Sequence, residues 1–179
     1  MPRLARSCWS SGAITGPAKC HWTRCVGASS HAGARTQGGG RKPINAKCET
    51  VHQLLTFRDA YRSRRCIVPV DGFFEWKAIK GQRAKQPYAI AMKDGAPFGI
   101  AGIWENWKEP ASGEWISTFA IITTDANELV AEIHDRMPLI LAPGDYIGWL
   151  SDDPDPRDLM RPQHSHEEQA DCNHSAMML

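Results

Sequence analysis

The sequence of 179 residues lacks three features that would assign it to a particular class. It has no apolar run close to the roughly 18 residues that a membrane-spanning helix needs, so we expect no membrane association. Its formal net charge is only +1, which excludes a strong overall field for nucleic acid or lipid. Arg3 and Arg6 are not followed by an apolar segment, so the N-terminus does not resemble a signal peptide.

Regular cysteine spacing is also missing, which favours a reduced, cytoplasmic setting over a disulfide framework. Two groups of side chains invite a metal interpretation, but neither has a standard spacing, and we expect no metal and no cofactor. The groups are Cys20, His21 and Cys25 near the start, and His164, His166, Cys172 and His174 near the end.

What is present fits one globular domain with a real core, since 42% of the residues are hydrophobic and 23% are charged. Any basic surface must be local, and the candidates are Arg41-Lys42 and the cluster at 62–65. Residues 1–43 show no sustained periodicity and are expected to be irregular. The domain core is predicted over 44–150, followed by a polar, disordered tail over 151–179.

Within the core, apolar runs separated by turn residues predict strands joined by short loops, and hence an antiparallel sheet. The runs cover 65–70, 73–77, 87–92, 98–104, 115–124 and 139–141. Capping signals at Thr50 with Gln53 and at Asp125 with Glu128 predict helices over 51–61 and just after 128. A last helix is expected over 143–150, packed through Tyr146, Ile147, Trp149 and Leu150.

Three polar side chains stand out as candidates for chemistry. Glu75 lies between Phe74 and Trp76, where apolar neighbours would raise the pKa of a carboxyl group, although it could equally point to solvent. His134 follows a short helix, whose C-terminus favours an imidazolium, although a lone histidine is more often structural. Asn45 offers a donor and an acceptor on an extended segment, and a turn asparagine is the simpler interpretation.

Trp104, Trp107 and Trp115 surround one loop, where core packing is the first explanation and a stacking platform for bases the second.

Several short motifs occur in one order along the chain and together resemble the SOS response-associated peptidase (SRAP) family over about 44–150. They are Ile44-Asn45-Ala46-Lys47, Asp71-Gly72-Phe73-Phe74-Glu75-Trp76, Gln86-Pro87-Tyr88, Ala101-Gly102-Ile103-Trp104 and His134-Asp135-Arg136-Met137-Pro138.

The resemblance implies an α+β fold with a curved or barrel-like antiparallel sheet and a cleft for single-stranded DNA. It implies a protein that shields abasic sites by a covalent DNA-protein crosslink. We also expect a cytoplasmic monomer that is associated with the nucleoid when it is bound to DNA. Asn45 would orient the reacting groups, Glu75 would handle protons near an amine, and His134 would act as acid and base. Lys47 and Arg136 suit phosphate contacts, and Trp76 either lines the cleft or packs in the core.

The printed sequence departs from the family at residue 2, which is Pro2 instead of the cysteine whose amine and thiol form a thiazolidine with the abasic sugar. Our hypothesis is a frameshift or misassigned start, with an inactive protein as the consequence if Pro2 is genuine. Removal of Met1 would alternatively expose the secondary amine of Pro2, which could form an iminium with the aldehyde.

Three functions therefore stay open: a crosslinking enzyme with autoproteolytic N-terminal processing, a non-covalent single-stranded DNA-binding remnant, and a peptidase or other hydrolase that uses Glu75 and His134.

Overall fold

The computed structural model describes the backbone of residues 8–10, 22–23, 26–27, 43–108, 112–162 and 170–173. Side chains are described for 43–106, 108 and 112–162. Within these ranges no helix is long and apolar enough to cross a membrane.

Strands dominate the described chain, and the helices are short. The strands are β1 (Cys8–Ser10), β2 (Trp22–Thr23), β3 (Val26–Gly27), β4 (Asn45–Lys47), β5 (Arg65–Val70), β6 (Phe73–Ala78), β7 (Lys85–Met92), β8 (Phe98–Lys108), β9 (Trp115–Asp125), β10 (Arg136–Pro138), β11 (Ile140–Leu141) and β12 (Ala170–Asn173). The helices are α1 (Arg58–Ser63), α2 (Glu128–Ala131) and α3 (Tyr146–Trp149), with 3-10 helices η1 (Pro143–Asp145) and η2 (Arg157–Leu159).

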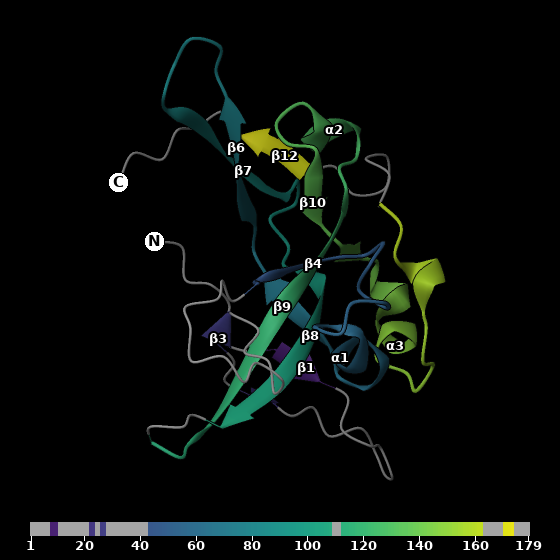
Figure 1. Ribbon diagram of the computed structural model, residues 1–179. Helices are drawn as coiled ribbons and strands as arrows, with labels where there is room; N and C mark the ends of the chain where they lie inside the picture. The colour runs from purple at the N-terminus through teal and green to yellow at the C-terminus, as the bar shows by residue number, and fades with distance from the viewer. Residues whose placement is uncertain are drawn as a thin grey trace.

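Two sheets make up the fold. The larger has nine strands in the order β10-β9-β8-β5-β1-β2, with β11 on β8 and with β3 and β4 parallel to β9. The smaller has the order β12-β7-β6 and lies at one end of the larger sheet (Figure 1). The predicted α+β class is confirmed, and the described strands do not close into a complete barrel.

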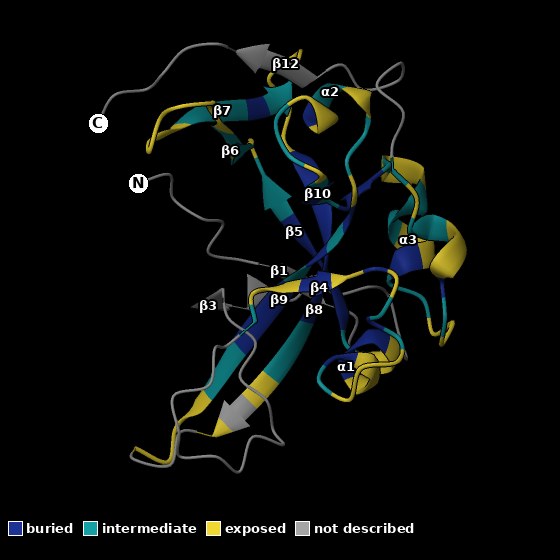
Figure 2. Ribbon diagram, turned by 45° about the horizontal axis from the view of Figure 1, so that its top comes forward, coloured by how far each residue is buried: buried dark blue, intermediate teal, exposed yellow. Residues whose placement is uncertain are grey.

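The core fills the large sheet and the helices beside it. Trp149 and Tyr61 are fully buried and pack against Ile103, Ile122 and neighbouring apolar residues. Figure 2 shows this buried zone where β8, β9 and β10 meet, with exposed colours on the outer faces of α1 and α3. The long β8–β9 ribbon then extends away from the core.

Arg65 is buried, although the sequence places it in a candidate basic surface. Only 2% of the residue is exposed. Its guanidinium donates to five backbone carbonyls, those of Tyr61, Arg62, Trp149, Ser151 and Asp153, at 2.5–3.4 Å. The prediction of a basic surface is therefore wrong for Arg65, because an arginine with this many acceptors can be taken out of water. Arg41 and Lys42 lie outside the described residues.

The predicted helix over 51–61 is only partly right. Turns occupy most of the segment between Cys48 and Phe57, and α1 begins at Arg58 without a side-chain cap. The predicted apolar face fails at Leu55, which is 76% exposed, whereas Tyr61 packs in the core. The capping box at Thr50 therefore does not start a continuous helix.

Two further helix predictions need correction. The N-cap of α2 is Asn127, whose side chain accepts a hydrogen bond from the backbone of Val130 at 3.0 Å, and Asp125 instead ends β9. Ile147 in α3 is 84% exposed, because Tyr146 and Trp149 make the contacts with the core.

The start of the predicted tail contacts the domain. Its carbonyls at Ser151 and Asp153 bind Arg65, and the Tyr61 hydroxyl donates to Asp155 at 3.0 Å. Further on, β12 pairs with β7. The prediction of disorder is therefore wrong for 151–162. The boundaries of the domain core stay a prediction.

Candidate functional site

Glu75 lies at the middle of β6, opposite Tyr88 of β7. The pleat puts it on the same face as Phe73, which packs against a buried cluster that contains Ile90 and Phe98. Partial burial beside this cluster raises the pKa of the Glu75 carboxyl group above its ordinary value, and desolvation is the largest cause. A carboxyl group in this state can hold or take up a proton closer to neutral pH.

His134 sits between α2 and β10, where its backbone N–H donates to the Val130 carbonyl at 2.9 Å. The backbone N–H of Arg136 donates to the imidazole Nδ1 at 3.0 Å. This bond forms when the proton of the neutral ring lies on Nε2, whereas a proton on Nδ1 would instead be donated to the Arg136 carbonyl, 3.1 Å away. When the ring gains a second proton, the Arg136 carbonyl and the Asp135 carboxylate, both 3.1 Å from Nδ1, can accept it.

The fold brings Glu75 and His134 within electrostatic reach of each other. The positive charge of His134 is the largest influence that lowers the Glu75 pKa, and the Asp135 carboxylate opposes it. The positive charge of Lys85 on β7 also lowers the Glu75 pKa, by a smaller amount. Glu75 on β6 and His134 between α2 and β10 therefore lie close enough for the charge of His134 to affect the protonation of Glu75.

Asn45 and Lys47 both lie exposed on β4, with the buried Ala46 between them. β4 runs parallel to β9 and pairs Asn45 with Ile121 and Lys47 with Thr123. On its other edge, Thr123 pairs with Pro138 of β10. β4 is thus separated from the strand after His134 by β9 alone, which is compatible with Asn45 and His134 serving one site; that role stays a prediction.

Arg136 is largely enclosed, with 18% of its side chain exposed. Its guanidinium donates to both carboxylate oxygens of Glu49, at 2.6 and 3.1 Å, to Asp125 at 2.8 Å and to the Thr123 carbonyl at 2.7 Å. These contacts compete with a phosphate, so any DNA contact by Arg136 would share the guanidinium with Glu49. Its predicted role in DNA binding remains untested.

The tryptophans do not act as one cluster. Trp76 is 50% exposed on the opposite face of β6 from Glu75, which argues against core packing. Trp104 packs beside the buried cluster of Cys66, Val68 and Phe119, whereas Trp115 is 70% exposed. The side chain of Trp107 lies outside the described residues.

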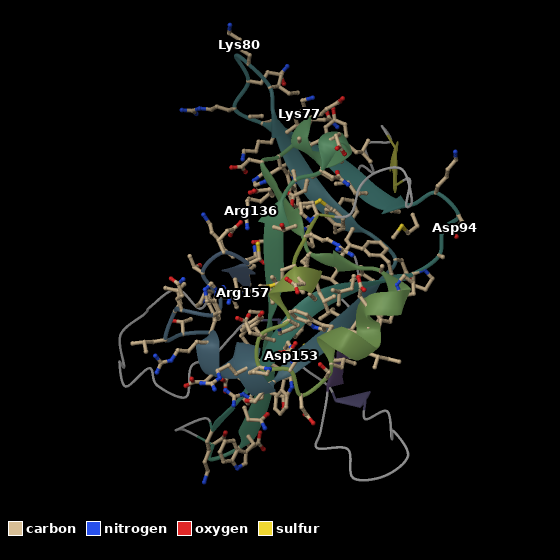
Figure 3. The ribbon with its side chains drawn as sticks, turned by 90° about the vertical axis from the view of Figure 1, so that its right-hand side faces the viewer. Lys77, Lys80, Asp94, Arg136, Asp153 and Arg157 are labelled. Atoms are coloured by element: carbon tan, nitrogen blue, oxygen red, sulfur yellow. The ribbon has the colours of Figure 1, made fainter. Side chains whose placement is uncertain are left out.

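A group of four cations was missed from the sequence. Lys77, Lys80, Arg83 and Lys85 lie on the β6–β7 hairpin, and the stretch 76–93 contains no acidic residue. None of the four forms an ion pair with the residues whose side chains are described. Figure 3 shows Lys77 and Lys80 on the projecting hairpin, with Arg136 farther along the molecule. A count of charge by segment would have identified this hairpin.

Metal ligands do not gather in the described part of the chain, where no three His, Cys, Asp or Glu side chains are grouped to hold an ion. The two candidate groups suggested by the sequence lie among residues whose side chains are not described. Cys48 and Cys66, the free cysteines with described side chains, are both buried.

Sequence comparison identifies a family match and named relatives. Residues 21–174 match the family described as SOS response associated peptidase (SRAP). The abasic site processing protein YoqW of Bacillus subtilis is 42% identical over 118 residues, which cover 66% of this chain and 52% of that protein. YedK of Escherichia coli, another abasic site processing protein, is 36% identical over 107 residues, covering 60% and 46%. The chain spans about half the length of these curated relatives.

Solved structures also match the fold. A protein from Bordetella bronchiseptica superimposes with a TM-score of 0.73 at 29% identity, covering 94% of this chain and 83% of that chain. One from Bacteroides thetaiotaomicron gives a TM-score of 0.65 at 36% identity, covering 70% and 56%.

Proposed function

Because this chain belongs to the SOS response associated peptidase family, we propose that it recognises abasic sites in single-stranded DNA and shields them through a covalent crosslink. The observation that carries the proposal is the electrostatic interaction of His134 with Glu75, whose carboxyl group has a raised pKa. Relatives named as abasic site processing proteins support the substrate. We further propose that it acts as a cytoplasmic monomer.

The chemistry needs acid and base at successive steps. An amine adds to the C1′ aldehyde of the ring-opened sugar, and the resulting carbinolamine loses water to give an imine. A thiol then adds across the imine carbon and nitrogen, which closes a thiazolidine with no net oxidation. In this proposal His134 protonates and deprotonates the sugar oxygens through Nε2, Glu75 takes and returns the amine proton, and Asn45 orients the aldehyde.

DNA binding would begin at the cationic hairpin. Lys77 lies on β6, the strand that carries Glu75, and the hairpin adds the further donors Lys80, Arg83 and Lys85. Lys47 would add a phosphate contact on the exposed face of β4, and the half-exposed Trp76 would stack on a base. Contacts of this kind predict binding that weakens steeply as salt concentration rises.

The deciding experiment mixes the full chain with a single-stranded oligonucleotide that contains one abasic site, followed by a denaturing gel. The chain with Pro2 is the reference, and the Pro2→Cys variant supplies an amine and a thiol at one residue once Met1 has been removed. We expect a denaturant-resistant complex from Pro2→Cys, and Glu75→Gln in that background should form it about 100-fold more slowly. Glu114→Gln, which changes an exposed glutamate on the β8–β9 ribbon, should leave the rate unchanged.

Absence of any complex from the Pro2→Cys protein without Met1 would contradict the crosslinking function of the chain as printed. Equal rates with Glu75 and with Gln at position 75 would contradict the role of Glu75.

Non-covalent binding of single-stranded DNA is the second candidate, and it is favoured by the hairpin cations, which form no ion pair with any described side chain. It predicts salt-dependent binding by the Pro2 chain, with no denaturant-resistant complex from either form. The same gel, run beside an anisotropy titration in two salt concentrations, separates the two candidates.

A further inference from the structure

Glu49 follows β4 by two residues and is bound to Arg136, which begins β10. These strands occupy opposite edges of β9, since Thr123 pairs with Lys47 on one side and with Pro138 on the other. The two-oxygen contact between Glu49 and Arg136 therefore connects both edge strands across β9. The Thr123 carbonyl at 2.7 Å from Arg136 fixes the guanidinium to the strand between them.

Arg136 also determines the orientation of His134. Its backbone N–H donates to Nδ1 of the imidazole, and its carbonyl lies 3.1 Å from the same nitrogen. Displacement of Arg136 would change both contacts at once. These backbone atoms are held by the pairing of Arg136 with Asp125 in the β9–β10 ladder, and the contact of the guanidinium with Glu49 adds a second attachment.

The contact between Glu49 and Arg136 is bidentate. Two parallel N–H···O bonds to one carboxylate fix the guanidinium in its plane, which a single bond does not. Arg136 lowers the pKa of Glu49 to about 2, so the carboxylate stays ionised throughout the physiological range. Asp125 makes only one bond to the same guanidinium, at 2.8 Å, from a side chain that is 78% exposed.

We propose that Glu49 is a positioning residue for the acid-base site: by holding Arg136 across β9, it sets the tautomer and the orientation of His134 relative to the strand that carries Asn45. Glu49 reaches the reaction only through Arg136 and is not itself a catalytic residue. The functional part of this inference rests on the proposed function, while the effect on the imidazole does not.

Removal of the Glu49 charge has two opposite consequences for the proposed reaction. The chemical step should slow, because the proton donor loses its alignment. Binding of DNA should stay equal or become tighter, because an anion disappears and the Arg136 charge is no longer neutralised by it. General loss of folding would weaken both, so the opposite signs distinguish positioning from a merely structural role.

The test compares Glu49→Gln with Asp125→Asn, the matched change at the other carboxylate on Arg136. Nitrogen-15 NMR of the imidazole in the full chain should show a proton on Nε2 and an acceptor Nδ1 in the native protein and in Asp125→Asn. In Glu49→Gln the two nitrogen shifts should move toward a mixture of tautomers. In the Pro2→Cys background, Glu49→Gln should crosslink about tenfold more slowly, with DNA affinity equal or higher.

An unchanged His134 spectrum in a folded Glu49→Gln protein would overturn the inference, as would weaker DNA binding with an unchanged crosslinking rate. If Pro2→Cys forms no crosslink at all, the proposed function fails, and the NMR comparison still decides whether Glu49 orients His134.

Discussion

The two sheets share a chain but differ in what they do. β5 and β6 are separated only by Asp71-Gly72, yet the first four residues of β5 are buried, whereas β6 contains no buried residue. The nine-stranded sheet carries most of the core, and the three-stranded sheet carries Glu75 on a half-covered face. Stability and proposed chemistry are thus concentrated in different sheets, and His134 lies where they meet.

This division has a physical reason. Full burial of a carboxylate without partners is too costly to tolerate, and full exposure leaves its pKa ordinary. A small sheet packed on the edge of a large one offers the intermediate environment that a general acid or base needs. Changes in the large sheet should therefore affect folding, and changes at the junction should affect chemistry.

The largest effect is expected from Arg65→Ala in the large sheet. The substitution removes the donor for five backbone carbonyls and releases the segment that begins at Ser151. We expect a loss of about 3 kcal/mol or more in the free energy of unfolding, measured by urea denaturation. Arg62→Ala, an exposed neighbour, should stay within about 0.5 kcal/mol, and an equally small loss for both variants would contradict the role of Arg65.

A smaller loss should follow from Gly99→Ala at the pairing of β5 and β8. An added Cβ would meet the Ile67 side chain at 2.7 Å and the Tyr146 hydroxyl at 2.8 Å. Overpacking of this kind costs about 1–3 kcal/mol. Gly144→Ala is the control, since nothing lies within 4 Å of its added Cβ. Equal melting temperatures for the two variants would show that the sheet relaxes around the methyl group.

Glu75→Gln should distinguish the roles of the two sheets most clearly, because it removes activity without loss of stability. The folded state raises the pKa of Glu75, so the charged carboxylate opposes folding at neutral pH and the protonated form does not. Glutamine should therefore be as stable as glutamate or more stable at pH 7, and the difference should vanish in acid. Denaturation at several pH values checks this, and a clear loss of stability at pH 7 would contradict it.

Glu49→Gln is expected to lower stability by less than either substitution in the large sheet. Its pKa is lowered from 4.5 to about 2 by Arg136, so its contribution is present above the ordinary pKa and is lost as pH falls toward 2. Because the side chain is 47% exposed, solvent screening limits this contribution to roughly 1 kcal/mol or less. The native protein should lose this contribution to its free energy of unfolding between about pH 5 and 2, the interval set by the ordinary and the lowered pKa of Glu49. Glu49→Gln should show no such loss.

Much of this fold follows from the sequence. Apolar runs bounded by turn residues locate β5, β7, β8 and β9, and the turn at Lys93-Asp94-Gly95 is confirmed by a positive φ of 72° at Gly95. Pairing between distant strands cannot be predicted in this way. That β5 and β6 belong to separate sheets depends on long-range contacts with β8 and β7, which local pattern does not contain.

The site was predictable in part. Apolar neighbours indicate a perturbed carboxyl group at Glu75, and the structure gives it a raised pKa. The partners of the site residues are harder to predict from the sequence, because the contact between Glu49 and Arg136 joins residues 87 positions apart. Arg65 shows the same difficulty: a row of arginines indicates a charged surface, and only the folded chain reveals which one is buried against carbonyls.

The most direct test of the central claim is a carbon-13 NMR titration of the Glu75 carboxyl group in the native chain and in His134→Gln. The account predicts a pKa above the ordinary glutamate value in the native protein and a further rise in the variant, because the positive charge that favours the carboxylate is gone. An ordinary pKa in the native chain, or the same pKa with and without His134, would contradict the claim that the two sheets bring these groups together.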